Sequence, residues 1–106
     1  MPIPPTPPSY GTEVSFRLPP GTSDDARALA ARLAAAAAGS RRHVLFLNDE
    51  AGEYGCLAEW EREEDAVAYA DLPEVRAVLA ELAERSDREP RVRRYAMEEQ
   101  PTVKRF

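Results

Sequence analysis

The segment from Tyr54 to Arg85 constrains the fold of this chain more than any other, because its hydrophobic period changes once, from two to about 3.6 residues. The first seven residues alternate, which predicts a half-buried strand ending at Trp60. The side of this strand that we expect to face the core carries Tyr54, Cys56, Ala58 and Trp60.

A helical region is predicted to follow this strand directly, from Glu61 to Ala70, with acidic residues in its first turn. Asp71-Leu72-Pro73 should interrupt it, since proline suits the first position of a new helix. The restarted helix has the spacing of a buried stripe, carried by Val75, Val78, Leu79 and Leu82.

The first half of the chain predicts one strand and one helix. Residues Glu13–Leu18 alternate in polarity, which indicates a half-buried strand. An alanine-rich stretch running to Ala38 then has high helix propensity. We expect the side chain of Thr22 or Ser23 to cap its free amides.

Two further strands complete the expected elements. The apolar run Val44–Leu47 leads through a polar loop into the strand that ends at Trp60, and Arg91–Met97 forms a last strand. The order β-α-β-β-α-β is the split βαβ pattern of the ferredoxin-like α+β fold. It predicts a four-stranded antiparallel sheet with two helical regions on one face. The other face then needs cover, which a second copy of the chain would supply in a two-fold homodimer.

Composition narrows the classes of partner. Residues 1–11 contain five prolines and are expected to form an arm, followed by a single domain over 12–106. A net charge of −5 argues against a nucleic-acid surface. No apolar run approaches the ~20 residues of a membrane span, and no secretion signal is visible, so a cytoplasmic location is expected.

Metal and cofactor sites find little support in the sequence. The single cysteine, Cys56, excludes an intrachain disulfide, and its apolar neighbours indicate a buried filler. One histidine argues against a zinc or iron site made by the protein alone. No glycine-rich loop opens a helix in the way that cradles phosphate. We therefore expect no metal and no cofactor.

The stretch YGCLAEWEREEDAVAYADLPEVRAVLAEL resembles the antibiotic biosynthesis monooxygenase family. The shared pattern is a strand ending in Trp60, an acidic helix start, a break at Leu72-Pro73-Glu74 and the last strand. The resemblance implies a dimeric α/β barrel with a ligand cleft between helices and sheet. Members of this family include cofactor-free oxygenases that act on quinols or polyketide anthrones, haem-degrading enzymes, and proteins without known chemistry. The resemblance implies that this chain belongs with one of these groups.

Residue by residue, the chain departs from the anthrone-oxidising members that it resembles. These have a tyrosine six residues after the tryptophan, where this chain has Ala66, and an asparagine near the position of Leu57 or Ala58. Haem-degrading members supply a histidine from the second helical region, and Glu61–Arg85 has none. The catalytic set of the anthrone-oxidising members is therefore incomplete in this chain, and haem binding through such a histidine is not expected.

Two residues are candidates for catalysis, His43 and Tyr69, and a third, Trp60, is a candidate for substrate binding beside them. His43 is the only side chain whose ordinary pKa lies near neutrality, so it could act as a general base toward a phenol or anthrone, although exposure at a strand start is the simpler interpretation. Tyr69 could turn into the same cleft as Trp60 and act as a second base, or it could be a core tyrosine. Trp60 could line the cleft and bind substrate, or simply pack.

Three other residues are candidates for substrate binding. Asn48 could orient a ligand, although asparagine at this point commonly serves a turn. Arg93 and Tyr95 share one face of the last strand and could line either the cleft or the dimer interface.

Two functions follow from the sequence. The first is a cofactor-independent monooxygenase that binds a small apolar or aromatic molecule, a quinol or a polyketide-type substrate. The alternative is a non-catalytic ligand-binding or interaction dimer on the same fold.

Overall fold

The computed structural model describes residues 7–101 and contains the predicted order of elements. The second helical region is split at Asp71-Leu72 as predicted, so three helices are present. In chain order the elements are β1 (Ser9–Arg17), α1 (Ser23–Ala36), β2 (Arg42–Asn48), β3 (Glu53–Trp60), α2 (Glu63–Ala70), α3 (Pro73–Arg85) and β4 (Arg91–Met97).

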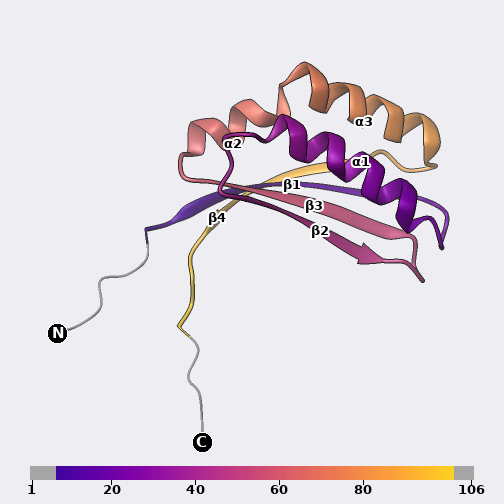
Figure 1. Ribbon diagram of the computed structural model, residues 1–106, viewed down its shortest axis with the longest axis horizontal. Helices are drawn as coiled ribbons and strands as arrows, with labels where there is room; N and C mark the ends of the chain where they lie inside the picture. The colour runs from indigo at the N-terminus through magenta and orange to yellow at the C-terminus, as the bar shows by residue number, and fades with distance from the viewer. Residues whose placement is uncertain (1–6, 102–106) are drawn as a thin grey trace, which may run out of the picture.

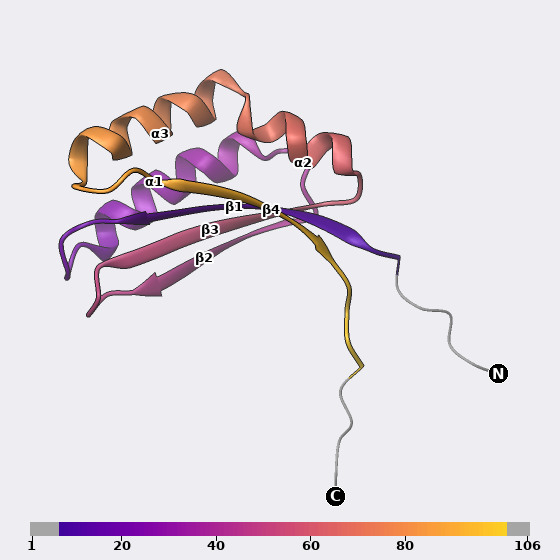
Figure 2. The same ribbon diagram turned by 180° about the vertical axis from the view of Figure 1, so that it is seen from behind.

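The four strands form one antiparallel sheet in the order β2-β3-β1-β4. All three helices lie on the same face of this sheet, with α1 and α3 side by side and α2 at one end (Figures 1 and 2). This confirms the predicted α+β ferredoxin-like arrangement.

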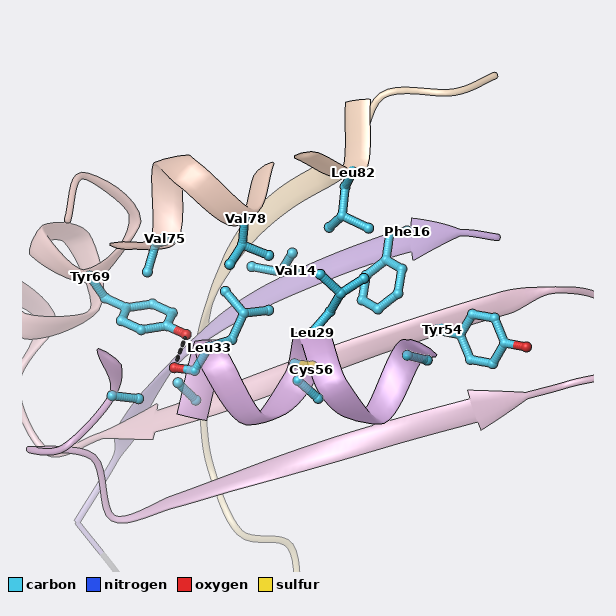
Figure 3. Packing of buried hydrophobic residues seen from close by; sticks show 14 of the residues in the cluster. Val14, Phe16, Leu29, Leu33, Tyr54, Cys56, Tyr69, Val75, Val78 and Leu82 are labelled. Carbon is cyan, nitrogen blue, oxygen red and sulfur yellow. Dashed lines mark hydrogen bonds between the residues drawn. The ribbon is translucent and has the colours of Figure 1, made fainter. Parts of the chain in front are cut away.

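The core lies between the helices and the sheet, and alternate residues of β1 and β3 point into it. Tyr54, Cys56, Ala58 and Trp60 are all buried, as the period of two predicted. Leu29 and Leu33 of α1 meet the buried stripe of α3 above these strands (Figure 3). That stripe is confirmed at Val75, Val78 and Leu82, with Leu79 packed at its margin.

β1 begins earlier than the sequence predicted. It starts at Ser9, so Ser9–Gly11 lies in the sheet, and residues 1–6 of the expected arm fall outside the described residues. Gly11 is admitted because it has no side chain: a Cβ there would lie 2.9 Å from Leu57 Cδ1 and 3.0 Å from Met97 Sδ. The glycine therefore makes room in the strand for two apolar neighbours.

The predicted side-chain cap of α1 is wrong. Thr22 occupies the N-cap position, but its Oγ1 donates to the carbonyl of Pro19 at 2.6 Å and makes no capping bond. A threonine hydroxyl readily forms hydrogen bonds with nearby backbone groups, and here it bonds to the preceding turn instead of to the helix. The helix also ends at Ala36, two residues before the predicted end.

The second face of the sheet is open. No helix among residues 7–101 covers it (Figure 2). Phe46 on this face is 46% exposed, and it lies against Gly55 of the neighbouring strand. Within the same range, no helix is long and apolar enough to cross a membrane.

Candidate functional site

Three of the predicted site residues gather at one end of the sheet, on the side that faces the helices. His43 of β2 lies opposite Ala58, which makes it a diagonal neighbour of Trp60 on the same face. Diagonal neighbours have Cα atoms about 7–8 Å apart, within reach of aromatic side chains. The Trp60 and Tyr69 rings are in contact, with centroids 5.3 Å apart and planes at 51°.

Two ring nitrogens in this group are buried without a hydrogen-bond partner. They are Nε2 of His43 and Nε1 of Trp60, the two such side-chain atoms found in the described part of the chain. The Trp60 side chain is almost wholly enclosed, with the residue 5% exposed. Because buried polar groups in folded proteins are nearly always bonded, this unpartnered pair is an exception that needs an explanation.

The environment of His43 keeps its imidazole neutral. The residue is half-buried, and desolvation lowers the pKa of His43 below its ordinary value of 6.5. With the ring proton on Nδ1, Nε2 is a free acceptor. His43 therefore has the protonation state that a general base needs at neutral pH.

Tyr69 is placed for a structural role instead. Its hydroxyl donates to the carbonyl of Leu33 at 2.8 Å (Figure 3), and burial, with a contribution from Cys56, raises the pKa of Tyr69 well above its ordinary value. Leu33 is among the last four residues of α1, whose carbonyls lack helical partners, and the Ala37 N–H bonds to Ala34 instead. A phenol held in this way stays protonated and cannot accept a proton, which argues against Tyr69 as a base.

The other three predicted site residues lie elsewhere. Asn48 ends β2 opposite Glu53, and its Oδ1 accepts from the Ala51 N–H at 3.4 Å, which is the turn role that asparagine commonly has. Arg93 and Tyr95 project from the open face of β4. None of the three is brought next to His43 and Trp60.

Two residues of β1 near the site were missed by the sequence analysis. Thr12 is buried, and its Oγ1 donates to the carbonyl of Ala66 at 2.8 Å, which ties α2 to the sheet. Tyr10 pairs with Trp60 across β1 and β3 and lines a hollow of about 220 Å³ beside Ala66 and Arg94. The hydrophobic alternation does extend back to Tyr10, but the prolines that precede it masked the strand.

Cys56 is a buried filler, as predicted. Desolvation raises the pKa of its thiol to about 12, so the reactive thiolate is absent at neutral pH. In residues 7–101 no group of three or more His, Cys, Asp or Glu side chains could hold a metal ion.

Comparison with known proteins identifies the fold through structure alone. No protein-family model matches the sequence, and no curated protein matches it. Rv0793 from Mycobacterium tuberculosis superimposes with a TM-score of 0.68 at 18% identity, over 89% of this chain and 99% of that one. A candidate antibiotic biosynthesis monooxygenase from Caulobacter crescentus gives 0.67 at 15% identity, over 90% and 94%. This chain has the antibiotic biosynthesis monooxygenase-like fold.

A third structure with this fold has a stated activity. SnoaB from Streptomyces nogalater, a cofactor-independent oxygenase, superimposes with a TM-score of 0.64 at 16% identity, over 92% of this chain and 98% of its own. Others, such as NE2512 from Nitrosomonas europaea, are of unknown function. The monooxygenase-like fold therefore accommodates oxygenases, and the chemistry of this chain has to be argued from its own residues.

Proposed function

We propose that this protein is a cofactor-independent monooxygenase that acts on a small aromatic, quinol or polyketide-type substrate in a cleft between the helices and the sheet. His43 is the general base, and Trp60 orients the substrate. The observation that carries the proposal is the pair of buried, unpartnered nitrogens on these neighbouring side chains.

The two nitrogens differ in hydrogen-bonding character, and together they match a hydroxyl group. Nε1 of Trp60 can only donate, whereas Nε2 of a neutral His43 can accept. A phenol or enol oxygen accepts from the indole while its proton points at the imidazole. As the proton moves to His43, the Trp60 N–H remains in place to stabilise the developing oxyanion.

Deprotonation supplies the reactivity that a metal or flavin supplies in other oxygenases. The electron-rich enolate or phenolate can pass electrons to O₂. For an anthrone, the ring CH₂ becomes a carbonyl: one oxygen atom enters the product, the other leaves as water, and the substrate provides all four electrons. Since the substrate supplies all the electrons, the proposed reaction needs no external reductant and no redox cofactor.

The open face of the sheet supports a homodimer as the assembly. Val44, Phe46 and Leu57 form an apolar patch there, and Phe46 and Leu57 fit against Gly55 and Gly11. A second copy placed face to face would bury this patch, in agreement with the need for cover that the fold creates.

A non-catalytic ligand-binding dimer is the second candidate function. The contact of the Trp60 ring with Tyr69, whose hydroxyl is held by Leu33, favours it, because both aromatic rings already have packing partners. In that case the two nitrogens would bind a ligand hydroxyl or a water molecule without removing a proton.

Oxygen uptake separates the two functions. The purified protein is supplied with an anthrone and with a quinol, and oxygen consumption is followed. We expect catalysed uptake that falls by about 10²–10⁴-fold in His43→Gln, the usual range for loss of a general base. Arg93→Gln, a change on the opposite face of the sheet, is the control and should retain activity. Equal rates for His43→Gln and the unaltered protein would remove His43 as the base.

A further inference from the structure

The hollow of about 220 Å³ lies between α2 and β4, on the face of the sheet that carries the helices. From the sheet it is lined by Tyr10, Arg94 and Ala96. Tyr10 and Thr12 are two residues apart on β1 and point to the same face, and Thr12 is buried toward α2. Arg94 pairs with Thr12 and Ala96 pairs with Tyr10, so both also point to the helix side. One ligand can therefore contact all three side chains from the same face.

Helix α2 supplies the opposite wall of the hollow through Glu63, Ala66 and Val67. These residues have the i, i+3, i+4 spacing of neighbours on one side of a helix. Ala66 is 2% exposed and Val67 is 38% exposed, so this wall runs from the core outward to solvent. The apolar part of the lining thus consists of small or branched aliphatic side chains.

The two charged side chains of the lining have opposite signs. Arg94 and Glu63 do not pair with each other, and within residues 7–101 neither has another ion-pair partner. Glu64, in the same turn of α2, is by contrast paired with Arg62. The hydroxyl of Tyr10 likewise has no hydrogen-bond partner in the described range. The hollow therefore presents a free cation, a free anion and a free hydroxyl group around an apolar surface.

Both the charges and the volume restrict the ligand. A guanidinium fork binds a carboxylate through two parallel hydrogen bonds, and a carboxylate binds an ammonium group. A water molecule occupies about 30 Å³ in the liquid, so 220 Å³ corresponds to about seven water molecules. A small α-amino acid with an aliphatic side chain has about this size, and it carries both of the charges that the lining complements.

We propose that this hollow is a binding site for a small aliphatic α-amino acid such as L-valine. The carboxylate of the ligand binds the Arg94 guanidinium and accepts a hydrogen bond from the Tyr10 hydroxyl. Its ammonium group binds the Glu63 carboxylate, and its side chain lies against Val67 and Ala96.

This site is separate from the proposed oxygenase cleft. His43, Ala58, Thr12 and Arg94 follow one another in a row across the four strands. Strands in a sheet are about 4.8 Å apart, so three spacings separate His43 from Arg94 by about 14 Å. Helix α2 lies over the middle of this row, because Thr12 bonds to the carbonyl of Ala66 at 2.8 Å. The amino-acid site can therefore be tested independently of the oxygenase activity.

NMR titration of the full chain with L-valine tests this site, followed through the backbone amide resonances of Val67 and Ala96. The matched ligand controls are 3-methylbutanoate, which is valine without its ammonium group, and 2-methylpropylamine, which is valine without its carboxylate. Arg94→Gln and Glu63→Gln each remove one charge of the lining. Arg93→Gln and Glu61→Gln remove a charge of the same sign outside the hollow. A circular dichroism melt establishes that each variant is folded.

We expect L-valine to shift both resonances in a saturable way, and each control ligand to bind more weakly by about fivefold or more, the effect of losing one exposed ion pair. Arg94→Gln should weaken valine binding by about the same factor without weakening that of 2-methylpropylamine. Glu63→Gln should weaken valine binding without weakening that of 3-methylbutanoate. Arg93→Gln, Glu61→Gln and His43→Gln should bind valine as the unaltered protein does.

Three results would overturn the proposal. The first is a folded protein that does not bind valine. The second is an affinity for either control ligand equal to that for valine. The third is a loss of valine binding in Arg93→Gln, Glu61→Gln or His43→Gln as large as that in Arg94→Gln, which would place the ligand elsewhere or reduce the effect to overall charge.

Discussion

Replacing Tyr69 by phenylalanine separates the structural and catalytic interpretations of this residue. The change removes one oxygen atom and leaves the ring, so contact with Trp60 is retained. The carbonyl of Leu33, whose residue is 0% exposed, loses the hydroxyl that donates to it at 2.8 Å. Leaving a buried acceptor unpaired costs about 1–3 kcal/mol in the free energy of unfolding.

The loss should be visible as a lower melting temperature. In a domain of this size, 1 kcal/mol corresponds to about 4–8 °C, so we expect Tyr69→Phe to melt about 5–20 °C below the unaltered protein. Tyr54→Phe is the matched control. Its hydroxyl bonds to Asp49, which is exposed and can be rehydrated, so its loss should be about 1 kcal/mol or less.

Thermal melts followed by circular dichroism give the two shifts, and oxygen uptake below the lower melting temperature gives the activity. If the melting temperature of Tyr69→Phe were no lower than that of Tyr54→Phe, the stabilising role of the hydrogen bond from Tyr69 to the Leu33 carbonyl would be refuted. Complete loss of oxygen uptake in a Tyr69→Phe protein that is still folded would restore Tyr69 as the base, against the raised pKa that burial gives it.

Three further outcomes follow from the structure. Burial lowers the folded pKa of His43 below 6.5, so oxygen uptake should rise with pH through a midpoint below 6.5. The stability that neutral His43 contributes should be complete above pH 6.5 and lost as the pH falls through the folded pKa. A rate of oxygen uptake that does not change across this pH window would contradict His43 as the base. Gly52→Ala should destabilise by more than about 1 kcal/mol in urea unfolding, because Gly52 has φ +66° and a Cβ there would lie 2.2 Å from the Leu18 carbonyl oxygen; Gly21→Ala, with φ +83° and open space, should lose less. Phe46→Glu should shift the protein toward monomer in sedimentation, whereas Val67→Glu, similarly exposed but on α2, should not; unchanged sedimentation of Phe46→Glu would argue against the open face as the dimer interface.

The fold was predictable from the sequence because its elements are marked by local features. The strand that ends at Trp60, the break before Pro73 and the stripe of α3 each follow from a hydrophobic period or from the geometry of proline. The errors had two causes, a local hydrogen bond that replaced another at Thr22 and contacts with residues distant in sequence at Gly11. Thr22 bonds to the turn before it instead of capping α1, and Gly11 lies inside a strand because two neighbours fill its space.

The candidate site was only partly predictable. His43, Trp60 and Tyr69 were selected as single residues, and their placement together depends on which strands pair and in what register, which local patterns do not contain. The register of β1 and β4 places Arg93 and Tyr95 on the open face of the sheet, whereas His43 and Trp60 lie on the face toward the helices.

The most direct test of the proposed function follows the indole N–H resonance of Trp60 during titration with 1-naphthol and with its methyl ether. The chain has a single tryptophan, so one indole signal reports on the site. If Trp60 donates to a hydroxyl oxygen whose proton points at His43, naphthol should shift this signal in a saturable way. The methyl ether has no proton to give His43, so its affinity should be lower than that of naphthol by about tenfold or more. An indole signal that responds to neither compound, or equally to both, would contradict the proposed pairing of these two side chains.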